Sequence, residues 1–127
     1  MAPTPRPTDA ELAILRVLWD LGPSTVRQVF EVLSLERELG YTTVLKMLQI
    51  MDEKGLVQRD VTDRTHIFTA AQTQVQTQRH LVDDLLDRAF GGSSLNLVMQ
   101  ALATKKASRA ELAEIRKLLD QAERRKA

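Results

Sequence analysis

Four polar side chains recur at helical spacing between Gly40 and Gly55, in the stretch YTTVLKMLQIMDEK: Thr42, Thr43, Lys46 and Gln49. Threonine offers a hydroxyl and a methyl group, glutamine can bind the edge of adenine through two hydrogen bonds, and lysine can bind guanine or a phosphate. These are the groups that a helix uses in the major groove of DNA. A solvated surface helix carries the same residue types, so this face alone does not decide between the two interpretations.

The apolar residues of the same stretch predict which side of the helix is buried. At about 100° per residue, five of them cluster on one side: Tyr41, Val44, Leu45, Leu48 and Met51. The polar residues of the opposite side are Thr42, Thr43, Lys46, Gln49 and Glu53, with Ile50 among them. The first two turns contain no Asp or Glu, although acidic side chains favour the positive N-terminal end of a helix. The start of this helix is therefore suited to a phosphate.

Two further helices are predicted upstream. The sequence TDAE, Thr8 to Glu11, fits a capping box and begins a helix that continues to about Leu21. Gly22 to Ser24 ends this helix and supplies the N-cap of the next, which runs from Thr25 to about Leu35. The helix 41–54 is then the third, and Gly55 follows it as a left-handed C-terminal glycine.

A two-stranded hairpin is predicted next. The segment 56–70 is rich in β-branched and aromatic residues around a polar turn at 62–65. Three helices and a hairpin are typical of the winged helix-turn-helix fold, in which the third helix enters the major groove and the hairpin lies along the backbone. Arg64 at the hairpin tip and Arg27 near the start of the second helix are placed to approach phosphates. The predicted DNA-binding residues are Thr42, Thr43, Lys46, Gln49, Arg64 and Arg27.

Three more helices are predicted after the hairpin. One continues to Phe90, a short one follows Ser93 or Ser94, and the last begins with a capping box at Ser108 to Glu111. Their apolar residues exceed what three short helices bury among themselves, and pairing with a second copy would cover them. Packing against the N-terminal part is the alternative. The predicted dimer contacts are Val82, Leu86, Phe90, Leu95, Val98, Leu102, Leu112, Ile115 and Leu119.

The predicted fold class is therefore mainly α. A winged-helix DNA-binding domain is expected at residues 1–71 and a helical dimerisation domain at residues 72–127. A two-fold dimer would present its two third helices to half-sites about one DNA turn apart, which predicts a palindromic operator in double-stranded DNA.

Composition excludes several other classes. Of the 127 residues 43% are hydrophobic and 28% charged, the net charge is +1, and there is no cysteine. Disulfides and thiolate metal sites are thus excluded, and His66 and His80 lie too far apart in sequence for a metal motif, so no cofactor is predicted. No apolar run approaches the roughly 18 residues of a membrane span, and Met1 to Glu11 lacks the apolar stretch of a signal peptide. We expect a cytoplasmic protein without membrane insertion.

An enzyme is not predicted. Asp83, Asp84 and Asp87 lie close in sequence, and His80 stands one turn before Asp84, but no nucleophile or glycine-rich phosphate loop accompanies them. We interpret them as a solvated acidic face. Two alternatives stay open, a helical protein-interaction adaptor without DNA binding and a small-molecule-responsive winged-helix regulator. An adaptor would not bind DNA at any ionic strength.

Five stretches occur in an order that matches a known family: TDAELAILRVLW (8–19), YTTVLKMLQIMDEKGLV (41–57), DRTHIFTA (63–70), FGG (90–92) and SRAELAEIRKLL (108–119). With them the chain resembles the penicillinase-repressor family (BlaI/MecI/CopY type) of bacterial winged-helix proteins. The resemblance implies a homodimeric transcriptional repressor that binds inverted-repeat operators and dimerises through its C-terminal helices. It places Thr42, Thr43 and Lys46 toward the groove and Arg64 in the wing.

The resemblance also implies a route of control. In antibiotic-responsive members a membrane-bound sensor, a metalloprotease, triggers cleavage in the helix after the two glycines. Here that region is SSLNLVMQALATKK, residues 93–106, and it lacks the asparagine-phenylalanine pair associated with the cut. Copper-responsive members use paired Cys-x-Cys motifs, and the lack of cysteine excludes copper sensing through such thiolates.

Overall fold

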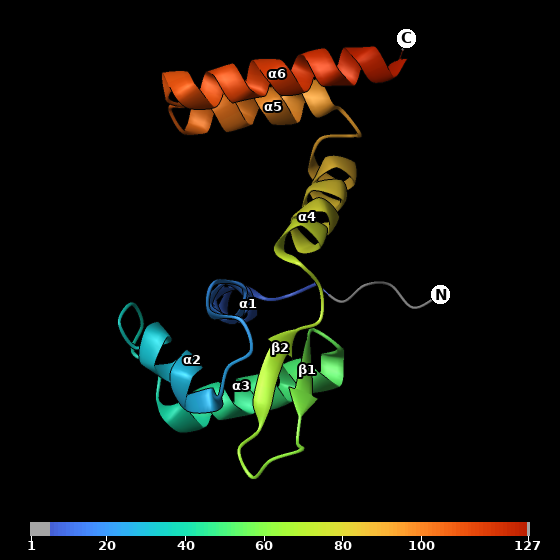
Figure 1. Cartoon of the computed structure of the whole chain (residues 1–127). Coiled ribbons are helices and arrows are strands. Elements are labelled where there is room, and N and C mark those ends of the chain that lie inside the picture. Colours follow the sequence, from blue (N-terminus) through green and yellow to red (C-terminus); the bar gives the residue numbers. More distant parts are fainter. Residues whose placement is uncertain (1–5, 127) are drawn as a thin grey trace. The chain divides into compact units, whose positions relative to one another are not determined.

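The computed structural model describes residues 6–126, and these form six helices and a two-stranded antiparallel sheet (Figure 1). In order they are α1 (Asp9–Leu21), α2 (Val26–Leu33), α3 (Tyr41–Lys54), β1 (Val57–Asp60), β2 (Ile67–Ala70), α4 (Gln74–Ala89), α5 (Ser94–Thr104) and α6 (Arg109–Lys126). The mainly α class and the predicted order of elements are confirmed. Residues 1–5, at the start of the segment that lacks the apolar stretch of a signal peptide, lie outside the described residues.

The chain divides into two compact units, Met1–Asp83 and Asp84–Ala127, and α4 contributes to both. In the first unit the Trp19 indole nitrogen donates a hydrogen bond to the carbonyl oxygen of Gln72 at 3.0 Å, and Thr77 in α4 is buried. The predicted domain boundary after residue 71 stays a prediction. None of the described helices is both long enough and apolar enough to cross a membrane.

Side-chain caps begin the first two helices. The Thr8 hydroxyl accepts a hydrogen bond from the Glu11 amide at 3.2 Å, and the Glu11 carboxylate accepts one from the Thr8 amide at 2.9 Å, as the capping box predicted. The predicted second cap at Ser24 is wrong, because Thr25 caps α2 and forms the same reciprocal pair with Gln28. Ser24 is buried instead, and its backbone exchanges two hydrogen bonds with Phe68 of β2.

The core of the first unit is formed by α1, α2, α3 and the hairpin. Its buried apolar residues are Ile14, Leu15, Val17, Leu18, Val26, Val29, Leu33, Val44, Leu48, Met51, Val57 and Phe68. From α3 it receives three fully buried side chains, as the helical pattern predicted. Tyr41 is not one of them. Its side chain is 41% exposed, its ring packs edge-on against Phe30 with centroids 5.9 Å apart, and the Arg27 guanidinium lies 5.7 Å from its centroid.

The position of Tyr41 has a simple physical reason. It is the first residue of α3, so it lies at the rim of the core beside α2 rather than between packed elements. At the other end of the helix Gly55 takes the predicted left-handed conformation, with φ of 82°, and the Leu56 amide donates to the Met51 carbonyl at 2.9 Å. The C-terminal end of α3 is thus defined by residues close to it in sequence.

A partly buried ion pair joins α1 to the end of α3. The Lys54 ammonium lies 2.9 Å from Glu11 Oε2 and 3.1 Å from Oε1, and the Glu11 side chain is only 7% exposed. Burial alone would raise the pKa of Glu11, but the hydrogen bond from the Thr8 backbone and the Lys54 ammonium outweigh it and hold the pKa below its ordinary value of 4.5. The pair fixes the C-terminal end of α3 relative to α1.

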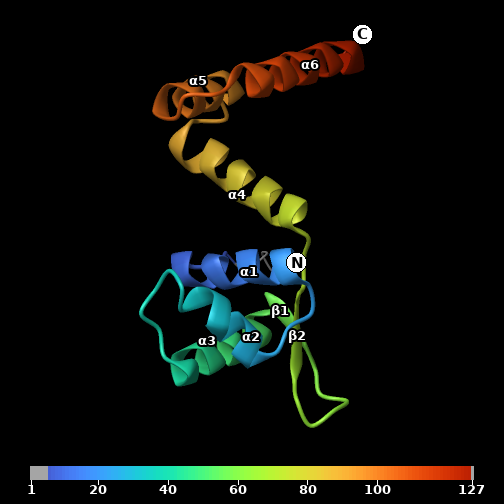
Figure 2. The same ribbon diagram turned by 60° about the vertical axis from the view of Figure 1, so that its left-hand side comes forward.

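The register pairs the two strands of the hairpin, and an ion pair connects the hairpin to α3. Val57 pairs with Ala70 and Asp60 with Ile67, and Arg59 of β1 lies 3.6 Å from Asp52 of α3. In the loop the Asp60 carboxylate accepts hydrogen bonds from the hydroxyl and amide of Thr62, which hold the pKa of Asp60 below its usual range. Figure 2 shows the loop extending beyond the helices of the first unit.

The second compact unit contains the end of α4 together with α5 and α6. Gly91 and Gly92 have φ of 55° and 83° and separate α4 from α5, which Ser93 caps through a hydrogen bond from the Asn96 amide. The Ser108 hydroxyl accepts a hydrogen bond from the Glu111 amide at 3.1 Å, at the predicted start of α6. No residue of this unit whose side chain the structure describes is buried.

Candidate nucleic-acid interface

The outer face of α3 carries the four polar residues singled out in the sequence. Thr42, Thr43, Lys46 and Gln49 are all exposed, on the side opposite the buried core residues. The N-cap of the helix is Gly40, which has no side chain to accept a hydrogen bond from the first amides. The first turn also contains no acidic residue. The N-terminal amides of α3 therefore keep their partial positive charge without a carboxylate to neutralise it.

The outer face has two edges. The side of α3 next to the wing carries Asp52, which pairs with Arg59 of β1, and at about 100° per residue Gln49 lies on the same side. Thr43 lies on the other edge. Ile50, seven residues later, returns to within about 20° of Thr43 and is 38% exposed. Lys46 lies between the two edges, and Ile50 is an apolar residue among polar ones.

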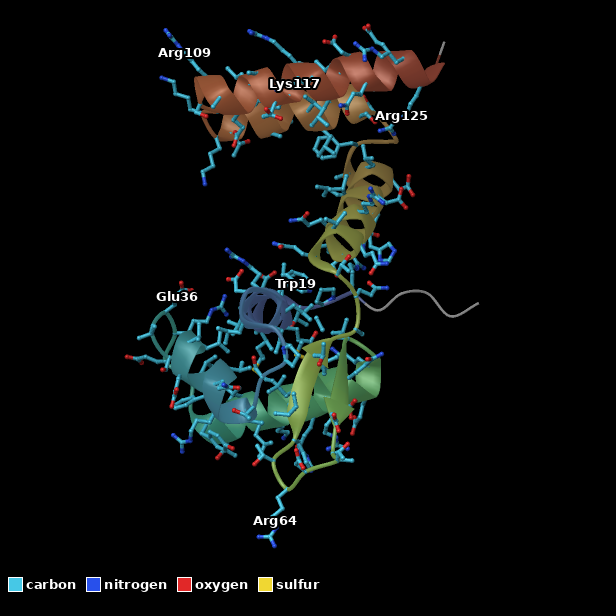
Figure 3. The ribbon with its side chains drawn as sticks, in the orientation of Figure 1. Trp19, Glu36, Arg64, Arg109, Lys117 and Arg125 are labelled. Carbon is cyan, nitrogen blue, oxygen red and sulfur yellow. The ribbon has the colours of Figure 1, made fainter. Side chains whose placement is uncertain are left out.

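Arg27 and Arg64 are brought together by the fold. Both line an open depression between the start of α2, the first turns of α3 and the hairpin loop, together with Thr25, Tyr41, Thr65 and His66 among others. Figure 3 shows Arg64 extending outward from the tip of the hairpin. The depression thus combines two guanidinium groups, an imidazole and three hydroxyl groups, which are suitable donors for a phosphate.

Arg27 has two contacts of its own. Besides the Tyr41 ring, it lies 3.9 Å from the Glu31 carboxylate one turn later in α2, with side chains 71% and 62% exposed. An exposed pair of this kind contributes little, so a phosphate can compete for the guanidinium. Thr25, Thr65 and Tyr41 were not predicted as site residues. Threonines are common at caps and turns, and no sequence signal distinguishes these two.

The residues predicted for dimer contacts are exposed or half-buried. Val82, Leu95, Val98, Leu102 and Leu119 are between 40% and 69% exposed, and Leu86, Phe90, Leu112 and Ile115 are intermediate. Met99 and Leu118, which are not in the predicted set, are also exposed, at 55% and 61%. Leu95, Val98, Met99 and Leu102 fall on one stripe of α5 at helical spacing.

The acidic residues of α4 are exposed or half-buried. Asp84 lies 3.9 Å from Arg88, and His80 and Asp83 border an open depression with Gln72, Gln76 and Arg79 in the first unit. Among the residues that the structure describes, no three metal-ligating side chains converge. The fold and the exposed face of α3 together define a winged-helix DNA-binding protein.

Comparison with known proteins gives the family. The sequence matches the penicillinase repressor family over residues 7–121, and the chain belongs to this family of DNA-binding transcriptional regulators. It is 39% identical over 95 residues to the transcriptional regulator BlaI of Mycobacterium tuberculosis (strain ATCC 25618 / H37Rv), covering 74% of this chain and 69% of the relative. It is 23% identical over 129 residues to the penicillinase repressor of Bacillus licheniformis, covering 99% and 98%.

A solved structure supports the fold independently. The solution structure of the monomeric form of Bacillus licheniformis BlaI in complex with the blaP half-operator aligns with a TM-score of 0.51 and 24% identity, covering 58% of this chain and 90% of that chain. This likeness confirms the winged-helix fold. Membership of a family of transcriptional regulators also means that the protein is a repressor and not an enzyme.

Proposed function

We propose that this repressor binds, as a homodimer, to an inverted-repeat operator in double-stranded DNA and blocks transcription in the cytoplasm. The observation that carries the proposal is the arrangement around α3. Its exposed polar face adjoins a depression that is lined by Arg27, Arg64 and His66. The relative from Bacillus licheniformis, whose solution structure contains a half-operator, supports the same mode of binding.

Each group has a role that follows from its position. Thr42, Thr43, Lys46 and Gln49 face outward and would contact base edges in the major groove. Arg64 in the wing and Arg27 at the start of α2 would bind backbone phosphates beside the inserted helix. Phosphate contacts fix the register and orientation of the protein, and the α3 face then selects the sequence.

The homodimer is supported by the exposed apolar side chains of the second unit. A stripe of four on α5, Leu95, Val98, Met99 and Leu102, is between 40% and 69% exposed. Covering such a stripe with the same stripe of a second copy removes it from water by a two-fold contact. The dimer would place two α3 helices on half-sites about one DNA turn apart.

Derepression by proteolysis in the second unit is the finer part of the proposal. Cleavage in α5 would separate the dimer contacts from the DNA-binding unit. No described residue of α5 is buried, so a protease could reach this helix. A membrane-bound sensor metalloprotease is the partner that the family resemblance implies. Because the asparagine-phenylalanine pair is absent, its cut would fall at a different bond.

A salt-titrated gel shift tests DNA binding. The full chain is incubated with a palindromic duplex selected from a random pool and with a random duplex of equal length. We expect a specific complex with the palindrome, whose affinity falls linearly on a plot of log K against log salt concentration. An adaptor without DNA function would form no complex with either duplex at any salt concentration.

Replacing one groove-facing side chain tests the role of α3. Thr43→Ala is expected to relax base preference by about 1–3 kcal/mol at one position in each half-site, because its hydroxyl and methyl contacts are lost. The readout is the binding profile over all single-base variants of the palindrome. Thr104→Ala, at an exposed threonine of α5, is the control. An unchanged profile for Thr43→Ala would remove this residue from the contact face.

A further inference from the structure

Ile50 is an apolar residue on the outer face of α3. Its side chain is 38% exposed, although Val44, Leu48 and Met51 of the same helix are fully buried. It follows Thr43 on the edge of the face that lies away from the wing, two turns further along the helix. Ile50 is therefore not a core residue, and it has no group that could form a hydrogen bond with a base.

The chemistry of Ile50 fits one feature of the major groove. Among the four base pairs only thymine presents a methyl group there, and apolar side chains distinguish it by direct contact. An isoleucine in a helix is held almost entirely in one χ1 rotamer, so its methyl groups are already positioned and lose little freedom on binding. It makes no hydrogen bond to a base, so it would discriminate by contact with the methyl alone.

We propose that Ile50 is a specificity-determining residue that recognises the 5-methyl group of a thymine in each operator half-site. The proposal rests on the proposed function, since it requires α3 to lie in the major groove. Seven residues of α-helix span about 10 Å, so the thymine contacted by Ile50 lies roughly three base pairs from the base contacted by Thr43.

The test removes the methyl group and nothing else. In the selected palindrome each thymine pair is replaced in turn, symmetrically, by deoxyuridine, and the affinity of the full chain is measured at fixed salt concentration. We expect one symmetric replacement to weaken binding by roughly three- to fivefold per half-site, the effect of one buried methyl group. The sensitive position should lie about three base pairs from the position at which Thr43→Ala relaxes the preference.

A double-mutant cycle assigns the effect to the side chain. Ile50→Ala should bind the thymine and deoxyuridine duplexes equally at that position, because the methyl group has lost its partner. Ile50→Val, a smaller truncation, should keep part of the difference. Val32→Ala, at a residue of α2 with nearly the same exposure of 37%, is the matched control and should keep the full difference.

The outcomes separate the inference from the proposed function. If the unmodified palindrome is bound but no deoxyuridine position weakens binding, the proposal for Ile50 is wrong while operator binding stands. The same holds if a position is sensitive and Ile50→Ala keeps its full sensitivity. If no duplex is bound specifically, both the operator proposal and the role of Ile50 fail.

Discussion

The two compact units differ in how far their large apolar side chains are buried. In the first, Ile14, Val29, Val44, Leu48 and Met51 are fully buried between three helices and a hairpin. In the second, no described side chain is buried, and residues such as Leu95, Met99 and Leu118 are more than half exposed. Both units are helical and both have amphipathic helices, so secondary structure alone does not account for the difference.

The two units therefore differ in whether their own core can stabilise them. Three helices that cross a hairpin enclose a shared volume, whereas α5 and α6 expose apolar residues that would be covered by a second chain. We infer that the first unit is stabilised by its own core and that the second depends on dimer formation. Trp19, the chain's single tryptophan, lies in the first unit and reports on its unfolding.

The largest effect is expected in the core of the first unit. Phe68→Ala should lower the free energy of unfolding by about 3–5 kcal/mol, because it removes a ring that is 1% exposed and leaves a cavity. The measurement is urea unfolding followed by Trp19 fluorescence. Leu35→Ala, at a side chain that is 84% exposed, is the control and should change stability by less than about 0.5 kcal/mol. A loss for Phe68→Ala no larger than the control would contradict a self-sufficient core.

A charge on the apolar stripe of α5 should disrupt the dimer. Val98→Asp is expected to raise the dimer dissociation constant at least a hundredfold, about 3 kcal/mol, because a carboxylate would lose its water in the interface. Sedimentation equilibrium measures the constant, and the Trp19 unfolding curve should stay unchanged. Gln100→Asp lies on the opposite side of α5 and serves as the control. Equal dissociation constants for the two variants would place the contact elsewhere.

The ion pair between Lys54 and Glu11 should contribute less to stability than the core, and its contribution should depend on pH. Lys54→Met leaves the Glu11 carboxylate buried without its partner and should cost about 1–3 kcal/mol at pH 7. Because the pKa of Glu11 is lower in the folded than in the unfolded state, the contribution is present above pH 4.5 and is lost as the pH falls through the lower folded value.

Urea unfolding at pH 7 and at pH 3.5 checks this sign. The difference between the original chain and Lys54→Met should shrink at the lower pH. Lys117→Met, which removes an exposed pair with Glu114 in the second unit, should change the Trp19 curve at neither pH. If the stability difference between the two proteins grew at pH 3.5, the effect of Lys54→Met would not come from loss of the pair with Glu11.

The smallest effect is expected at the wing. Arg64→Gln should weaken operator binding several-fold at low salt and reduce the slope of log K against log salt by about 0.9, since one phosphate contact is lost. The preference among base variants should not change, in contrast to Thr43→Ala. Arg116→Gln, at an exposed residue of α6, is the control. A slope equal to that of the original chain would exclude a phosphate contact by Arg64.

Local patterns accounted for most of the first unit. The capping box at Thr8, the bounds of α3 and the left-handed Gly55 depend on interactions within one or two turns, and they follow from neighbouring residues. Ser24 and Tyr41 were predicted wrongly, as a cap and as a core residue. Ser24 bonds to a strand more than forty residues away, and Tyr41 lies at a rim that only the packing of α2 defines.

For the interface the same distinction holds. The sequence by itself determined which side of α3 is polar, because the periods of apolar and polar residues within one helix set its two faces. It could not show that Arg27 and Arg64 border one depression or that Lys54 pairs with Glu11. Those contacts join elements far apart in the chain, and the tertiary structure decided them because only the packing of α1, α2 and the hairpin around α3 brings these side chains together.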